Sequence, residues 1–244
     1  MKIYGKNAVV ELVNSGRVKV NKVYLQSEFL KNKGEFQALL NSKGIQVEYL
    51  PKLQLDKKAN GARHQGVIAE TGEFEYVELE KVIAEQKRAK KPLFLVILDG
   101  LEDPQNLGTI LRVCECAGVN GVILPKNRSV LVNETVAKVS AGALFHINVI
   151  KVGNIHQTIK DLKEQNVFVY ACDMDGVEMY NTSLTGDIAL VIGGEGSGVS
   201  ELSRKLCDGI IKIPMFGKIN SLNASVSCGI CVFEAVRQRM IDGK

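Results

Sequence analysis

Six short, mostly apolar segments follow residue 92, and they constrain the fold more than any other feature of the sequence. They are LFLVIL (93–98), GVILP (121–125), FHINVI (145–150), VFVYAC (167–172), IALVIGG (188–194) and GIIKIP (209–214). Stretches with the period of an amphipathic helix separate them. A strand that is buried on both faces is apolar at consecutive positions, because neither face meets water. The pattern therefore predicts an α/β fold in which helices cover both faces of a parallel sheet.

A smaller unit precedes these segments. Stretches typical of a strand, a helix, a strand, and a loop with a third strand follow one another as VKVNKVYLQ, GEFQALLNSKG, IQVEYL and HQGVIAETG. They predict a small α/β domain over residues 1–72. The next stretch, YVELEKVIAEQKRAKKP, is charged, has helical periodicity and ends at Pro92, which predicts a linker helix over residues 73–92. Residues 93–244 then form the second domain.

Positive charge is concentrated in the N-terminal third of the chain. Residues 1–70 contain 12 Lys and Arg against 6 Asp and Glu, whereas residues 71–244 contain 19 against 21. Lys and Arg that neutralise phosphates provide the sequence-independent part of nucleic-acid affinity. The asymmetry indicates a contact with a polyanion, although a solvated surface explains the charge alone equally well.

The cysteine pattern favours neither disulfides nor a metal centre. The six cysteines are Cys114, Cys116, Cys172, Cys207, Cys228 and Cys231. The last two form a C-x-x-C motif, but the chain has no second pair at zinc spacing and no histidine near them. We expect buried structural roles for all six, no metal and no membrane contact, and a reducing cytoplasm, because the N-terminal region also has no apolar stretch of signal-peptide or membrane-span length. Asp173 and Asp175 lack the other ligands of a calcium loop, so a solvated turn is predicted there.

Polar and glycine residues follow three of the predicted strands. The three stretches are DGLEDPQNLGTILR (99–112), GGEGSGVS (193–200) and PMFGKINSLNAS (214–225). In open parallel sheets ligands bind beyond the carboxyl ends of the strands. Buried amides and hydroxyls also cost free energy unless they are hydrogen-bonded. The three loops together therefore predict one site for a small molecule.

The glycine-rich loop at residues 193–198 does not match two common nucleotide-binding motifs. No choice among its glycines gives the G-x-G-x-x-G spacing of dinucleotide-binding folds. In a G-x-x-x-x-G-K-[ST] phosphate loop that begins at Gly193, the required lysine is replaced by Val199. The loop is therefore too neutral to bind a triphosphate.

The three stretches, in this order, resemble the three motifs of the SpoU branch of the SPOUT RNA methyltransferases. The third motif continues as VSCGICVFEAVRQR, and in the N-terminal domain YGKNAVVELV and ANGARHQGVIAE resemble the L30e-like RNA-binding domain. Nearly the whole chain is covered, and the similarity is greatest to bacterial 23S rRNA guanosine 2′-O-methyltransferases of the RlmB type. The resemblance implies methyl transfer from S-adenosylmethionine to a ribose 2′-hydroxyl of 23S rRNA.

The resemblance also implies structure and binding residues. The family folds with a trefoil knot in the C-terminal domain and forms homodimers, with each active site near the interface. By motif, Gly193, Ile213 and Leu222 would contact S-adenosylmethionine through their backbone, with Gly194 and Pro214 alongside.

Five polar residues match the catalytic positions of the family: Asn106, Arg112, Glu195, Ser221 and Asn223. Methyl transfer is an in-line displacement that needs alignment and control of the hydroxyl proton, and it needs no metal. We expect Arg112 and Asn106, six residues apart on one helix, to face the same opening. Because a guanidinium does not readily lose a proton, Arg112 is expected to hold RNA phosphate and polarise the hydroxyl rather than act as a base.

Three alternatives stay open. The substrate could be tRNA or another rRNA site. The chain could be a catalytically silent ribosome assembly factor, which would bind RNA but not S-adenosylmethionine. A nucleotide-dependent oxidoreductase or transferase is disfavoured by the failed glycine spacings.

Overall fold

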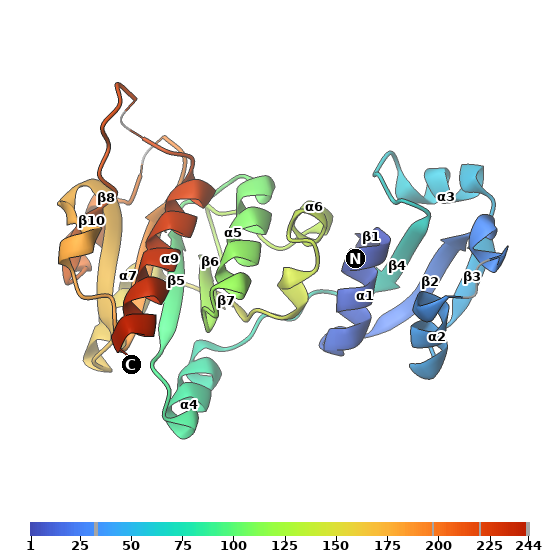
Figure 1. Ribbon diagram of the computed structural model, residues 1–244, viewed down its shortest axis with the longest axis horizontal. Helices are drawn as coiled ribbons and strands as arrows, with labels where there is room; N and C mark the ends of the chain where they lie inside the picture. Colours follow the sequence, from blue (N-terminus) through green and yellow to red (C-terminus); the bar gives the residue numbers. More distant parts are fainter. Residues whose placement is uncertain (32–33, 197, 220, 243–244) are drawn as a thin grey trace. The chain divides into compact units, whose positions relative to one another are not determined.

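The computed structural model describes residues 1–31, 34–196, 198–219 and 221–242. The chain forms two compact units (Figure 1). Unit 1 consists of Met1–Glu75 and Val132–His146, and unit 2 of Tyr76–Leu131 and Ile147–Lys244. Within the described ranges, none of the helices is both long and apolar enough to cross a membrane.

Unit 1 is built on a mixed sheet with the strand order β1-β4-β2-β3. Strand β4 runs antiparallel to β1 and β2, whereas β2 and β3 are parallel. The strands are β1 (Lys2–Tyr4), β2 (Val20–Gln26), β3 (Val47–Leu50) and β4 (Val67–Thr71). The helices are α1 (Lys6–Ser15), η1 (Ser27–Lys31), α2 (Glu35–Ser42), α3 (Lys52–Ala59), α6 (Glu134–Val139) and η2 (Ala143–Phe145).

Residues 132–146, which we call the β6–β7 segment, leave unit 2 and pack in unit 1. The carboxylate of Glu134 accepts the backbone N–H of Lys2 at 3.1 Å and the hydroxyl of Tyr4 at 2.8 Å. Burial and this carboxylate raise the pKa of Tyr4, which keeps the hydroxyl protonated as a donor. Gly142 has a φ of +99°, and a Cβ there would lie 2.6 Å from the side chain of Glu11, so the close approach requires glycine.

The sheet of unit 2 is parallel throughout, with the strand order β10-β8-β9-β5-β6-β7. The strands are β5 (Phe94–Asp99), β6 (Gly121–Pro125), β7 (Val149–Val152), β8 (Phe168–Glu178), β9 (Ile188–Gly193) and β10 (Gly209–Lys212). The helices are α4 (Leu79–Ala89), α5 (Pro104–Cys116), α7 (Ile155–Glu164), η3 (Met179–Asn181), α8 (Glu201–Leu206) and α9 (Ala224–Asp242). The chain proceeds from β5 to β7 on one side and then occupies the other side, so the order reverses between β5 and β9. Ligands bind at the carboxyl ends of strands at such a reversal.

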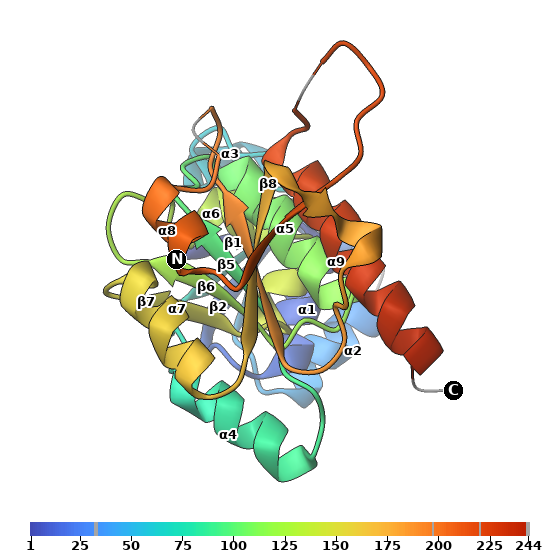
Figure 2. The same cartoon turned by 90° about the vertical axis from the view of Figure 1, so that its left-hand side faces the viewer.

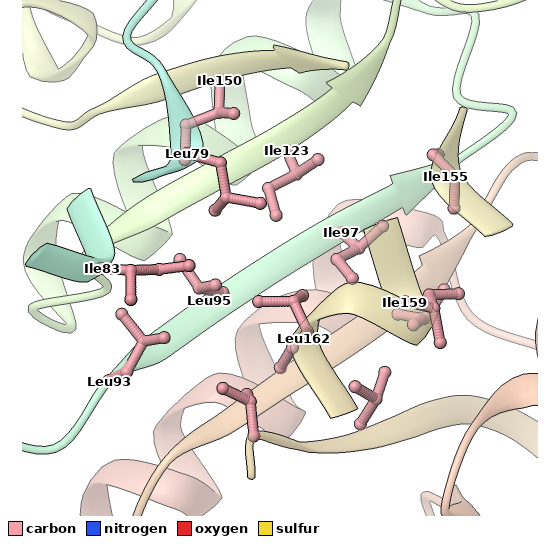
Figure 3. Packing of buried hydrophobic residues seen from close by; sticks show 14 of the residues in the cluster. Leu79, Ile83, Leu93, Leu95, Ile97, Ile123, Ile150, Ile155, Ile159 and Leu162 are labelled. Atoms are coloured by element: carbon pink, nitrogen blue, oxygen red, sulfur yellow. The ribbon is translucent and has the colours of Figure 1, made fainter. Parts of the chain in front are cut away.

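One face of this sheet packs against α4 and α7 through a continuous apolar core. Leu95 and Ile97, two residues apart on β5, point to the same face, toward Ile83 of α4 and Leu162 of α7 (Figure 3). Full burial of one such side chain contributes about 1.5–3 kcal/mol. The segment expected to be a linker, residues 73–92, therefore contains a helix whose apolar side chains belong to the core of unit 2.

Helix α5 packs against α9, which also contacts β9 (Figure 2). The local sequence explains where α5 begins and ends. Asp103 caps the helix by accepting the backbone N–H of Gln105, and Pro104 occupies the first turn, where its missing N–H is not needed. Gly118, with a φ of +72°, follows the end of the helix. These signals place the N-terminus of α5 directly after β5, at the ligand-binding edge of the sheet.

Candidate cofactor site

A cavity of about 600 Å³ lies beyond the ends of β8, β9 and β10 and beside the start of α9. Its volume is within the range of cavities that hold small organic ligands. Seven residues predicted from the sequence line it: Gly193, Gly194, Glu195, Ile213, Ser221, Leu222 and Asn223. The structure thus brings the second and third polar stretches of the sequence together at one cavity.

Two adjacent glycines allow backbone segments to meet at the wall of this cavity. A Cβ on Gly193 would lie 2.0 Å from the carbonyl carbon of Gly198, and a Cβ on Gly194 would lie 2.1 Å from the carbonyl oxygen of Gly100. Both clashes involve backbone atoms, so no change of rotamer could relieve them. The absence of side chains also leaves the backbone of β9 accessible to a ligand.

Hydrogen bonds to Asp99 connect the loop at residues 193–200, which we call the glycine loop, to the end of β5. The N–H of Gly194 donates to the Asp99 carbonyl at 2.9 Å, and the N–H of Ser200 donates to the Asp99 carboxylate at 3.0 Å. Gly194 and Gly198 pair across the loop, and Gly196 has a φ of +80°. The loop is therefore preorganised by its own backbone and by one carboxylate.

Asn106 and Glu195 come from different elements and contact each other. Asn106 lies on α5 and is buried, and its Nδ2 donates a hydrogen bond to the carboxylate of Glu195. Glu195 follows β9 and lines the cavity. Asn106 therefore holds a carboxylate at the edge of the cavity, although it does not itself belong to the lining.

Asn223 caps the helix that closes the cavity. Its Oδ1 accepts the backbone N–H of Ser225 at 2.9 Å and the hydroxyl of the same residue at 2.6 Å. Because the carbonyl oxygen is used in this cap, the side-chain amide nitrogen is the group that Asn223 offers to a ligand. Ser221, two residues earlier, contributes an exposed hydroxyl to the same wall.

An irregularity in β8 forms the wall that the sequence did not reveal. Ala171 pairs with Ile210 and Val177 pairs with Ile211, so residues 172–176 bulge out of register with β10. A Cβ on Gly176 would lie 2.4 Å from the carbonyl oxygen of Ile210, which explains the glycine. Four residues of the bulge line the cavity, namely Cys172, Asp173, Met174 and Asp175, and Arg204 of α8 lies with them. The solvated turn predicted around the two aspartates is wrong, because they belong to a strand.

Two family models match the chain, and they agree with this geometry. The SpoU rRNA Methylase family matches residues 93–233, which is more than half of the chain. A model for RNA 2′-O ribose methyltransferase substrate binding matches residues 2–77. The chain belongs to the SpoU rRNA methylase family. This confirms the family predicted from the three motifs.

Curated relatives extend the similarity over almost the whole chain. The Bacillus subtilis protein YacO, named as a TrmH family tRNA/rRNA methyltransferase, is 40% identical over 240 residues, which are 97% of this chain and 95% of YacO. A Staphylococcus aureus relative of the same family name is 43% identical over 240 residues, covering 97% of this chain and 96% of the relative.

Solved SpoU structures show the same fold. AviRb from Streptomyces viridochromogenes, a SpoU methyltransferase in complex with AdoMet, has a TM-score of 0.82 at 21% identity, covering 99% of this chain and 91% of AviRb. An AdoMet-bound rRNA methyltransferase from Sinorhizobium meliloti has a TM-score of 0.76 at 22% identity, covering 97% of this chain and 86% of that protein. The predicted α/β fold class with a parallel sheet is therefore confirmed. The trefoil knot stays a prediction.

Three of the residues assigned from the SpoU motifs lie outside the lining of the cavity: Asn106, which contacts Glu195, and also Pro214 and Arg112. Pro214 is the next residue after Ile213, which does line it. Arg112 is exposed on α5, whereas Asn106 on the same helix is buried. Six residues rotate a helix by about 240° beyond one full turn, so the two side chains leave α5 on different sides. Within a single chain the structure does not bring Arg112 to the cavity.

The cysteines of this SpoU protein differ in exposure. Cys114, Cys228 and Cys231 are buried as expected, but Cys116 is exposed, so the expectation of burial for all six is wrong. Cys116 lies two residues after the buried Cys114 on α5, so the two side chains leave the helix on nearly opposite sides. A hydrogen bond with Cys231, together with burial, raises the pKa of Cys172, and burial raises the pKa of Cys207 to about 12. Among the described residues, no three His, Cys, Asp or Glu side chains form a possible metal site.

Proposed function

We propose that this SpoU family protein uses S-adenosylmethionine to methylate a ribose 2′-hydroxyl, and that its target is a guanosine of 23S rRNA. The glycine-walled cavity at the reversal point of the sheet is the observation that carries the proposal. The match of residues 2–77 to a ribose methyltransferase substrate-binding family supports RNA as the substrate class. The bound AdoMet in AviRb supports the choice of cofactor.

The residues of the cavity fit this cofactor chemically. Gly193 and Gly194 leave backbone groups accessible, and Ile213 and Leu222 add apolar surface for an adenine ring. The Nε of Arg204 is buried and has no hydrogen-bond acceptor in the described part of the chain, as expected of a donor reserved for a ligand carboxylate. The lining of the cavity therefore offers backbone, apolar and charged groups to the different parts of S-adenosylmethionine.

The bound cofactor supplies an electrophilic methyl group on a sulfonium sulfur. The protein then has to align a ribose oxygen with that methyl group and to bind or accept the hydroxyl proton. We propose that the carboxylate of Glu195, oriented by Asn106, and the side chains of Ser221 and Asn223 bind the hydroxyl of the target ribose. Glu195, Ser221 and Asn223 all line one cavity, which supports a shared task.

We propose that Arg112 holds the RNA from outside the cavity. A guanidinium presents paired planar donors to a phosphate, which an ammonium cannot reproduce. Arg112→Lys keeps the charge but should lose alignment, and a displacement of about 1 Å can reduce the rate on the order of a hundredfold. Single-turnover methylation should fall that far while cofactor affinity stays unchanged. Full activity of Arg112→Lys would contradict the proposed role.

We propose a division of labour between the two domains predicted from the sequence. Residues 1–72 would bind rRNA, because this part carries the excess of Lys and Arg that phosphate contacts require. Residues 93–244 would bind the cofactor. An rRNA substrate also implies that the protein works in the bacterial cytoplasm.

An apolar stripe along α9 supports the predicted homodimer. Val226, Phe233 and Met240 are spaced by seven residues and are about half exposed or more, at 49%, 48% and 67%. Seven residues are close to two helical turns, so the three side chains lie on one face. An exposed apolar stripe of this kind is typical of a protein interface. Light scattering coupled to size-exclusion chromatography measures the oligomeric state directly.

Mapping of 2′-O-methyl groups in total RNA tests the substrate assignment. RNA from cells with and without the gene should differ at a guanosine of 23S rRNA, and the purified protein should restore that methyl group in vitro. A difference confined to tRNA would instead support the tRNA alternative. RNA binding without methylation or cofactor binding would support a silent assembly factor.

A further inference from the structure

Negatively charged residues outnumber positively charged ones in the lining of the cofactor cavity. The charged residues among the described lining residues are Asp173, Asp175, Glu195 and Arg204. Three carboxylates thus face one guanidinium, and a cavity with an excess of one sign attracts ligands of the other. Neither the motif positions nor the proposed handling of the ribose accounts for the two aspartates of the β8 bulge.

The two aspartates occupy different environments. The side chain of Asp173 is only 14% exposed, whereas that of Asp175 is 78% exposed. Arg204 lies 3.2 Å from the carboxylate of Asp175 and 3.8 Å from that of Asp173. Arg204 therefore pairs more closely with the outer aspartate, and its guanidinium offsets the field of the inner carboxylate less.

Asp173 also faces the glycine loop that forms the opposite wall. A Cβ on Gly198 would lie 3.3 Å from the Oδ2 atom of Asp173. The Oδ1 atom accepts the backbone N–H of Met174 at 2.7 Å, which fixes the carboxylate in place. The bulge and the loop together position one partly desolvated negative charge beside the cofactor backbone contacts of β9.

We propose that Asp173 makes the cavity selective for the cationic cofactor over its neutral product. This inference rests on the proposed use of S-adenosylmethionine. The cofactor carries a sulfonium, an ammonium and a carboxylate, whereas S-adenosylhomocysteine has lost the sulfonium charge. Three carboxylates and one guanidinium complement the first pattern better than the second. Methyl transfer therefore removes an attraction to Asp173 and favours release of the product.

The size of the effect follows from the partial burial of Asp173. Between charges several ångströms apart in a protein site of intermediate dielectric constant, the Coulomb interaction changes affinity on the order of tenfold. The same interaction at the exposed Asp175 is weakened by water and by its ion pair with Arg204. Asp173→Asn keeps the shape of the side chain and removes only the charge, and Asp175→Asn is the matched control.

Calorimetric titration of the full chain with three ligands tests the proposal. The ligands are S-adenosylmethionine, its cationic analogue sinefungin, and S-adenosylhomocysteine. Asp173→Asn should weaken the binding of the two cationic ligands about tenfold and that of the neutral product less than about twofold. Asp175→Asn should change each affinity less than about threefold. Added salt should reduce the preference of the wild type for the cationic ligands.

The outcomes separate this inference from the proposed function. Equal losses for all three ligands would make Asp173 a structural support of Arg204 and would overturn the proposal. Wild-type affinity of Asp173→Asn for all three ligands would overturn it as well. If the wild type bound none of the ligands, the cofactor assignment itself would fail.

Discussion

Substitution of Gly194 by alanine is the sharpest test of the glycine-walled cavity. The added methyl group would lie 2.1 Å from the carbonyl oxygen of Gly100 and 2.7 Å from its carbonyl carbon. Both atoms belong to the backbone at the end of β5, so the strands themselves must separate by about 1 Å to restore van der Waals contact. This separation would also stretch the hydrogen bond from the Gly194 N–H to the Asp99 carbonyl.

The cost can be estimated from these two effects. Overpacking of a tight site costs about 1–3 kcal/mol, and the upper end applies where only backbone can move. A weakened hydrogen bond adds about 1 kcal/mol. We expect Gly194→Ala to lower the free energy of unfolding by about 3–4 kcal/mol and to abolish measurable binding of S-adenosylmethionine.

Two other glycines of unit 2 provide graded controls. Gly196 has a φ of +80°, and among the described residues other than its chain neighbours no atom lies within 4 Å of the position that an added methyl group would take, so Gly196→Ala should cost only about 1 kcal/mol of backbone strain. Gly153 has no positive φ, and in the described part of the chain no atom beyond its sequence neighbours lies within 4 Å of an added Cβ, so Gly153→Ala should be neutral within about 0.5 kcal/mol. Urea denaturation and calorimetry measure the two quantities. Wild-type cofactor affinity in Gly194→Ala, or a smaller loss of stability than in Gly196→Ala, would refute the reasoning.

Three further predictions concern the rest of the chain. Glu134→Ala should lower the free energy of unfolding by about 1–3 kcal/mol in urea denaturation, because a partly buried tyrosine hydroxyl loses its acceptor; no change would contradict that role. Cys116 should react with a disulfide reagent in the native protein much faster than Cys207, whose thiol has a raised pKa, and mass spectrometry of labelled peptides would expose the reverse order. Removal of residues 1–72 should lower the melting temperature of the remaining chain, because the β6–β7 segment loses its packing partners; an unchanged melting temperature would show that this packing does not contribute.

The parallel sheet and the cavity position could be predicted from the sequence because each leaves a local signature. Continuous apolar runs such as 93–98 are typical of strands that are buried on both faces, and the helical stretches between them favour that interpretation. Glycine, asparagine and serine directly after strands mark the ligand-binding edge, and two of the three predicted loops line the cavity. The resemblance to the SpoU motifs then assigned residues within those loops.

The remaining wall of the cavity could not be predicted in this way. The aspartates of the β8 bulge follow VFVYAC in the sequence and are typical of a turn there. Their place in the cavity depends on the pairing with β10, where the register jumps between Ile210 and Ile211. Gly176 permits this jump. A Cβ at this position would clash with the backbone of Ile210 on β10, which is more than thirty positions away in the sequence. A single sequence contains no signal for a register set by such a distant partner.

The β6–β7 segment shows the same limit at the level of domains. NETVAKVSAGA has helical periodicity and follows an apolar strand, so local pattern assigns it to the second domain. Its carboxylate at Glu134 is instead satisfied by Lys2 and Tyr4, at the opposite end of the chain. The chain therefore passes between the two units at three points rather than one. Each unit consists of two chain segments, and a segment of the other unit separates them in the sequence. A single boundary at residues 73–92 therefore leaves Val132–His146 out of unit 1, although these residues follow β6 in the sequence and pack in that unit.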